Sequence, residues 1–225
     1  MRGKLIAFEG IDGSGKATQA DFLIRNLQRN GYKTKLISFP QYGESVFSAF
    51  VERYLRGEFG ESVDPYVTSL FYAGDRFEAR EKILKWLEQD YIVVCNRYYG
   101  SNIGHQGGKV DKKDLPKFLK WLEKLEFKVF GIPKPDITVF LHIPYTLSKF
   151  MVSKKPKRGY LKGKSFDIHE QSSEHLKRSF EAYMFALKKY NSWVKIDCTS
   201  GGKMLLRNQI ADKIWLEVRK KLEWS

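Results

Sequence analysis

The chain alternates between short apolar runs and longer segments in which apolar residues recur with helical spacing. The apolar runs have the length of strands and lie at residues 4–8, 34–39, 91–95, 137–142 and 194–198. Strands that alternate with helices predict an α/β fold, a five-stranded parallel sheet covered by helices on both faces. Because ligands of such sheets bind at the carboxyl ends of the strands, we expect functional residues there.

Several helices can be placed from their periodicity and end signals. The first is expected over residues 16–29, since Asn30-Gly31 is a common C-terminal stop. A second opens at Asp64-Pro65, an acidic cap followed by proline in the first turn. Its apolar face is predicted to contain Val67, Leu70, Phe71, Gly74 and Phe77, with Phe71 and Phe77 buried. Two later helices use Leu176, Phe180, Met184 and Leu187, and Ile210, Ile214, Val218 and Leu222.

The segment after the first apolar run carries the strongest chemical signal. It contains Gly10, Asp12, Gly13, Ser14, Gly15, Lys16, Ala17 and Thr18, with the glycine and lysine spacing of a phosphate-binding loop. Glycines let the backbone curl so that amides converge on phosphates, and the helix that follows favours the anion. The alternative is a glycine-rich turn with an incidental lysine. The order of strand, loop and helix favours a site for the phosphates of a nucleoside polyphosphate, with Lys16 reaching the β- and γ-phosphates.

Length, charge and cysteine content narrow the class of protein. The 225 residues are enough for one domain, expected over 1–225, and no run resembles a membrane span or signal segment. Cys95 and Cys198 lie in apolar, strand-like contexts, which is typical of reduced cysteines and a cytoplasmic protein. The net charge of +14 is compatible with nucleic-acid binding, but basic residues are spread along the chain. A positive field also suits an enzyme with two polyanionic substrates, the interpretation we favour.

Two further motifs accompany the loop. Residues 96–102, at the end of the third expected strand, read Asn-Arg-Tyr-Tyr-Gly-Ser-Asn, and residues 69–77 one helix earlier include Tyr72, Asp75 and Arg76. With Phe39-Pro40 after the second strand, they resemble the thymidylate kinases, nucleoside monophosphate kinases of the P-loop class. The resemblance runs from Lys4 to the last helix. It implies the P-loop kinase fold with a mobile lid, and phosphorylation of dTMP to dTDP by ATP.

The acceptor site can be interpreted from the residues and from the resemblance. Tyr72 and Arg76 are four apart on one helix face, and a ring with a guanidinium suits a planar base. In the family these positions stack on thymine and contact its O4. The alternative is an aromatic that packs on a neighbour and a solvated arginine. The resemblance also assigns Phe39, Pro40 and Asn102 to this substrate.

Three more residues of the acceptor site each have an alternative. Arg97 follows a strand and could hold the phosphate between the two nucleotides, or form a surface ion pair. Asp12 matches the acidic residue that contacts the acceptor sugar, or serves the turn and helix dipole. His105 takes the place of an aromatic that crowds the 2′ position of the sugar, or is a solvated loop residue.

The basic loop at residues 153–167 matches the family's lid. Because position 13 is Gly, the chain resembles the thymidylate kinases whose catalytic arginine lies in the lid. Arg158 is the arginine of this loop, and we expect it to act with Lys16 and Arg97 in catalysis.

Two departures from the common patterns concern the Mg²⁺ cofactor. Ala17 stands where many phosphate loops have a metal-binding hydroxyl, although Thr18 keeps one in the first turn. Asn96 replaces the family's Asp, which removes a negative charge near the phosphates. We expect Thr18 and Asn96 to contact Mg²⁺ weakly and through water, with a lowered apparent metal affinity.

Two other functions remain open from the sequence. Tyr72 could stack on any base, so a nucleoside monophosphate kinase of other or broader specificity is one alternative. Ala17, Asn96 and the charge suggest the other, a catalytically weak nucleotide-binding protein. The family resemblance also predicts a homodimer, although no interface can be read from the sequence.

Overall fold

A central parallel sheet organises the chain. The computed structural model describes residues 3–60, 62–153 and 173–222. The five strands of the sheet are β1 (Lys4–Glu9), β2 (Thr34–Ser38), β3 (Ile92–Asn96), β4 (Ile137–His142) and β5 (Trp193–Asp197), arranged β2-β3-β1-β4-β5. The predicted sheet is confirmed, and no strand end differs from its predicted position by more than one residue. Both cysteines are buried and free, as expected.

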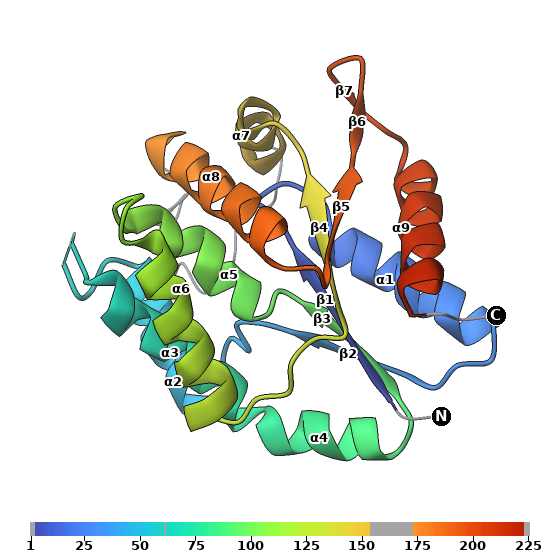
Figure 1. The fold of residues 1–225 in the computed structure, drawn as a ribbon, viewed down its shortest axis with the longest axis horizontal. Helices are drawn as coiled ribbons and strands as arrows, with labels where there is room; N and C mark the ends of the chain where they lie inside the picture. The colour runs from blue at the N-terminus through green and yellow to red at the C-terminus, as the bar shows by residue number, and fades with distance from the viewer. Residues whose placement is uncertain (1–2, 61, 154–172, 223–225) are drawn as a thin grey trace.

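Helices cover both faces of the sheet (Figure 1). On one side lie α1 (Lys16–Arg29) and α9 (Arg207–Lys221), and on the other α5 (Tyr99–His105) and α8 (Ser173–Lys189). A separate group beside the sheet contains α2 (Val46–Leu55), α3 (Pro65–Glu78), α6 (Leu115–Glu123) and the π-helical turn η2 (Lys124–Val129). The remaining elements are α4 (Arg80–Glu88), the 3₁₀ turn η1 (Gly107–Lys109), α7 (Tyr145–Ser153) and a hairpin of β6 (Thr199–Ser200) and β7 (Lys203–Met204). None of the described helices is both long and apolar enough to cross a bilayer.

The strand register brings three strand ends to one place. Phe8 of β1 pairs with Asn96 of β3, which in turn pairs with Ser38 of β2. The phosphate loop, the Asn96-Arg97 turn and the Phe39-Pro40 segment therefore leave the sheet side by side. The Phe39–Pro40 peptide is cis, and the Phe39 amide donates to the Asn96 carbonyl at 3.0 Å.

The predicted orientation of α3 is wrong for three of its five positions. Val67, Leu70 and Phe77 are 44%, 37% and 42% exposed, although they were expected on the packed face. Gly74 is buried as predicted, and Phe71 is partly buried against the rings of Phe50 and Phe59. The other buried positions are Thr68, Ser69, Ala73, Asp75 and Arg76. Polar residues can occupy the buried side because each has a partner; for example, the Ser69 hydroxyl donates to the Pro65 carbonyl at 2.7 Å. Periodicity located the helix but not the side that faces the protein.

Glycine allows α5 to lie close to α8. A Cβ atom built at Gly104 would come within 2.1 Å of the ring of Tyr183, which is completely buried. Helix α5 therefore sits close enough to α8 to fix the position of His105 at its end. The fold thus holds Asn102 and His105 on a short, packed helix.

Candidate active site

The phosphate loop has the geometry that its sequence predicts. Gly10, Gly13 and Gly15 all have positive φ (147°, 78° and 91°), a region that favours glycine. The Lys16 ammonium lies over the loop and donates to the carbonyls of Gly10 at 2.8 Å and Ile11 at 2.9 Å. Lys16 is thus buried next to amides that can bind an anion.

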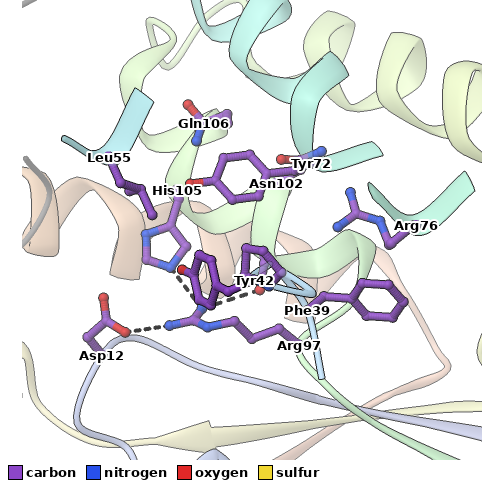
Figure 2. A pocket seen from close by; sticks show the side chains of 12 residues that line it. Asp12, Phe39, Tyr42, Leu55, Tyr72, Arg76, Arg97, Asn102, His105 and Gln106 are labelled. Atoms are coloured by element: carbon purple, nitrogen blue, oxygen red, sulfur yellow. Dashed lines mark hydrogen bonds and ion pairs between the residues drawn. The ribbon is translucent and has the colours of Figure 1, made fainter. Parts of the chain in front are cut away.

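A pocket lies beside the loop, and we call it the arginine pocket. It is lined by Asp12, Phe39, Pro40, Tyr42, Leu55, Tyr72, Arg76, Arg97, Ser101, Asn102, His105 and Gln106 (Figure 2). Every residue that the sequence assigns to the acceptor substrate is in this set. These residues come from five separate parts of the chain, so the fold brings together what the sequence could only suggest.

A second cavity, the loop pocket, adjoins the first. It is lined by Asp12, Gly13, Gly15, Lys16, Ala17, Thr18, Ser38, Phe39, Pro40, Tyr42, Asn96 and Arg97. Asp12, Phe39, Pro40, Tyr42 and Arg97 belong to both pockets. The two cavities therefore meet at Arg97, and two ligands bound in them would lie end to end there.

Arg97 is held at this junction by several contacts. Its guanidinium pairs with Asp12, donates to the Ser101 hydroxyl at 3.3 Å and lies 3.1 Å from Nε2 of His105 (Figure 2). Its backbone is left-handed, with φ of 68°, which is unfavourable for a residue with a Cβ atom. Arg97 does form an ion pair, as the alternative expected, but the pair lies in the pocket wall and its side chain is only 18% exposed.

A buried carboxylate supports the turn that contains Arg97. Glu9, the last residue of β1, accepts from the Tyr98 amide at 2.7 Å and the Ser101 hydroxyl at 2.8 Å. Complete burial raises the pKa of Glu9, and hydrogen bonds and the nearby charge of Arg97 only partly oppose this effect. Sequence reasoning did not identify Glu9, which directly follows the expected strand at residues 4–8.

Arg76 is buried in the wall of the arginine pocket. It is 1% exposed, so the alternative of a solvated arginine is wrong. Nε donates to Glu126 at 2.7 Å, and Nη2 makes a second bond to the same carboxylate. Burial alone would lower the pKa of Arg76, but the charge and hydrogen bonds of Glu126, with smaller contributions from Tyr98 and Asp75, together raise the pKa. The sequence did not identify Glu126.

Asp75 secures the segment that covers the pocket. It accepts from the Gln41 amide at 3.0 Å and from the Ser45 hydroxyl at 2.7 Å, which ties the loop after Pro40 to α3. Burial raises the pKa of Asp75. The cis Phe39–Pro40 segment and Tyr42 are thereby held against the opening.

Sequence reasoning missed several residues of the two pockets. Tyr42, Leu55, Ser101 and Gln106 line the arginine pocket, and Ser38 lines the loop pocket. Gln106 is 0% exposed, and neither polar atom of its side chain has a hydrogen-bond partner among the described residues. A buried amide of this kind suits contact with a polar ligand. In the sequence, the only indication that Gln106 lines the pocket is its position directly after His105.

His105 is part of the protein interior. It is 8% exposed at the end of α5, so the alternative of a solvated loop residue is wrong. Its ring stacks on His175 at 5.8 Å between centroids. Burial, and then the charge of Arg97, hold the pKa of His105 well below its usual range. His105 is thus a neutral ring that accepts from Arg97 through Nε2.

The predicted metal contacts are neutral groups in this structure. Thr18 and Asn96 line the loop pocket, and the Asn96 amide donates to the Ser38 hydroxyl at 3.3 Å. The described residues contain no group of three His, Cys, Asp or Glu side chains that could hold a metal ion. These donors fit Mg²⁺ that is held mainly by phosphates and waters, because Mg²⁺ keeps much of its hydration shell. Arg158 and the predicted lid beyond Ser153 lie outside the described residues.

The fold and the two joined pockets define a P-loop nucleotide kinase. The sequence model of the family "Thymidylate kinase" matches residues 8–210. Curated thymidylate kinases are similar: that of Mycobacterium tuberculosis is 29% identical over 180 residues, 80% of this chain and 83% of the relative. That of Caldanaerobacter subterraneus is 32% identical over 179 residues, 77% and 80% of the two chains.

Structural comparison agrees with the sequence relatives. The solved thymidylate kinase of Candida albicans matches with a TM-score of 0.75 and 26% identity, covering 98% of this chain and 93% of that one. The chain belongs to the thymidylate kinase family. Its activity is ATP-dependent phosphorylation of dTMP, and neither alternative, a different base specificity or a binding protein without turnover, is favoured.

The buried histidines make the stability depend on pH. Burial lowers the pKa of His175 to about 4 and that of His105 well below its usual range. The unfolded chain binds protons on both rings as the pH falls through about 6.5, whereas the folded protein keeps them neutral. We expect the free energy of unfolding, measured with urea, to fall from about pH 7 to about pH 5. The fall should be smaller in His105→Phe, and an equal fall would contradict this explanation.

Proposed function

We propose that the loop pocket binds the ATP phosphates and the arginine pocket binds dTMP, so that transfer takes place at Arg97. The observation that carries this proposal is the meeting of the two cavities at Arg97, with every predicted acceptor residue in one of them. Lys16 and the loop amides neutralise the donor phosphates. Tyr72 stacks on the base, Arg76 and Asn102 contact its polar edge, and His105 lies against the sugar.

The chemistry needs no covalent intermediate, because phosphoryl transfer depends on positioning and charge neutralisation. Asp12 pairs with Arg97 at the junction of the two pockets. When dTMP binds, its phosphate takes over donors of Arg97, and Asp12 becomes available to the sugar hydroxyl. Arg158 in the lid completes the positive charge around the transferred group. This last role rests on the family resemblance of the lid.

Mg²⁺ is the proposed cofactor. When bound, it neutralises phosphate charge and holds the phosphates in a reactive arrangement. Thr18, Ser38 and Asn96 would hold its water ligands from the loop pocket. The neutral Asn96 makes this support weaker than a carboxylate would.

A cytoplasmic protein of one domain is also proposed. The two buried, free cysteines support a reducing compartment. One continuous sheet contains strands from both ends of the described chain, which supports a single domain with the lid as an insert.

The direct test is ADP release from purified protein with ATP, Mg²⁺ and a set of monophosphates. Saturable turnover with dTMP, exceeding that with dCMP and with thymidine ribonucleotide, is the expected result. ATP binding without turnover at any Mg²⁺ concentration would instead indicate a nucleotide-binding protein.

Lys16→Ala should reduce kcat for dTMP phosphorylation by about a hundredfold or more, because one preorganised charge on the phosphates is lost. Steady-state kinetics and a circular dichroism spectrum measure activity and folding on the same sample. Lys112→Ala is the matched control, since Lys112 is 85% exposed and pairs only with Glu181 among the described residues. Normal turnover in Lys16→Ala would refute the assigned phosphate site.

Asn96→Asp should lower the Mg²⁺ concentration needed for half-maximal activity. A charge-assisted hydrogen bond contributes about 1.5–3 kcal/mol, so the shift should be about tenfold or more. Asn30→Asp at the exposed end of α1 is the same substitution outside the site. If both variants titrate like the parent protein, the neutral Asn96 does not limit metal binding.

A homodimer is proposed through α3. Val67, Leu70 and Phe77 form an exposed apolar stripe on this helix, and a second copy could bury the same stripe. Leu70→Glu should convert the dimer to a monomer in sedimentation analysis, because it places a charge in the interface. Leu216→Glu changes an equally apolar, 65% exposed position on α9 and should leave the dimer intact. A monomeric parent protein would contradict the proposal.

A further inference from the structure

Arg76 and Asn102, the two residues proposed to contact the polar edge of the base, both donate hydrogen bonds to the buried carboxylate of Glu126. Glu126 is 0% exposed and lies in the π-helical turn η2, a rare element that is often found at functional sites. Its Oε1 accepts from Nη2 of Arg76 and, at 3.1 Å, from Nδ2 of Asn102. Its Oε2 accepts from Nε of Arg76 at 2.7 Å. One side chain thus holds α3 and α5 in a common arrangement.

This contact fixes which atom of the Asn102 amide a ligand can reach. The Nδ2 group donates to the Ser69 carbonyl at 3.1 Å and to Glu126, which uses both of its hydrogens. The reversed amide would turn its oxygen toward two acceptors, an unfavourable arrangement in a buried site. Oδ1 of Asn102 is therefore the atom left for a ligand, and it can only accept.

Arg76 supplies the complementary group. Nε and Nη2 are bound to Glu126, so Nη1 remains as the terminal nitrogen that can donate to a ligand. Arg76 and Asn102 lie next to each other because they share Oε1 of Glu126. The wall of the arginine pocket therefore offers one donor beside one acceptor.

We propose that Glu126 is a positioning residue that makes the pocket select bases with a carbonyl next to a ring N–H. Thymine and uracil present this edge through O4 and N3–H. Cytosine presents the reverse, an amino donor next to a ring acceptor. Without the Glu126 carboxylate, Asn102 can turn its amide and Arg76 can shift, so both donor and acceptor positions are lost. This inference rests on the proposed dTMP site.

The test compares kcat/KM for dTMP, dUMP and dCMP in the parent protein and in Glu126→Gln. The dTMP-to-dCMP ratio should fall about tenfold or more, because charge-assisted hydrogen bonds to Glu126 orient both Arg76 and Asn102. The dUMP-to-dCMP ratio should fall equally, while the dTMP-to-dUMP ratio stays constant, since these two bases share the same edge. A ratio measured on one sample does not depend on the fraction of folded enzyme.

Further variants separate positioning from general structural support. Glu126→Asp keeps the charge but shortens the side chain by one methylene, and it should also lower the dTMP-to-dCMP ratio. This variant provides the test if Glu126→Gln does not fold. A double-mutant cycle with Asn102→Ala tests the coupling between the two residues. Glu126→Gln should change the dTMP-to-dCMP ratio much less in the Asn102→Ala background than in the parent protein. Glu81→Gln makes the same change in an exposed ion pair with Arg80 and should leave every ratio unchanged.

The outcomes distinguish this inference from the proposed function. If the parent protein prefers dTMP, and folded Glu126→Gln and Glu126→Asp have the same kcat/KM ratios as the parent protein, the role of Glu126 is overturned. The proposed function would not be affected by that result. Equal loss of kcat/KM for all three nucleotides would also overturn the role of Glu126, because a purely structural residue affects them together. A parent protein without turnover of any monophosphate would overturn the proposed function itself.

Discussion

The site depends on a carboxylate that is buried where β1 ends. Glu9 accepts hydrogen bonds from the backbone of Tyr98 and the side chain of Ser101, so it joins the start of the phosphate loop to the start of α5. Tyr183 of α8 adds a third hydrogen bond at 3.2 Å. The residue between these contacts, Arg97, is held in a left-handed conformation that it would not adopt by itself. Donor and acceptor sites share this single support.

Both arginines of the pocket follow the same physical rule. A guanidinium that is removed from water must be paired and hydrogen-bonded, and each here has a carboxylate from a different element. Asp12 pairs with Arg97 and Glu126 pairs with Arg76. The first pair is partly exposed and can exchange partners with a phosphate. The second is buried and keeps its partners, and it leaves Nη1 of Arg76 to donate to a ligand.

Local motifs carried most of what the sequence predicted. The phosphate loop, the Asn96-Arg97 turn and the spacing of Tyr72 and Arg76 each lie within a few residues, and all reach the expected pockets. Glu9 and Glu126 could not be found in this way, because their partners lie 89 and 50 residues away. The face of α3 was misjudged for a related reason, since pairing allows polar residues to occupy its buried side.

The buried Arg76–Glu126 pair also affects how the protein attracts its substrates. The chain carries a net charge of +14, yet both arginines of the arginine pocket are paired with carboxylates. The long-range field that draws in polyanions therefore comes from lysines and arginines elsewhere on the surface, and it weakens with ionic strength. In this kinase, the charges that attract the substrates over a distance are thus different from the charges that select the base.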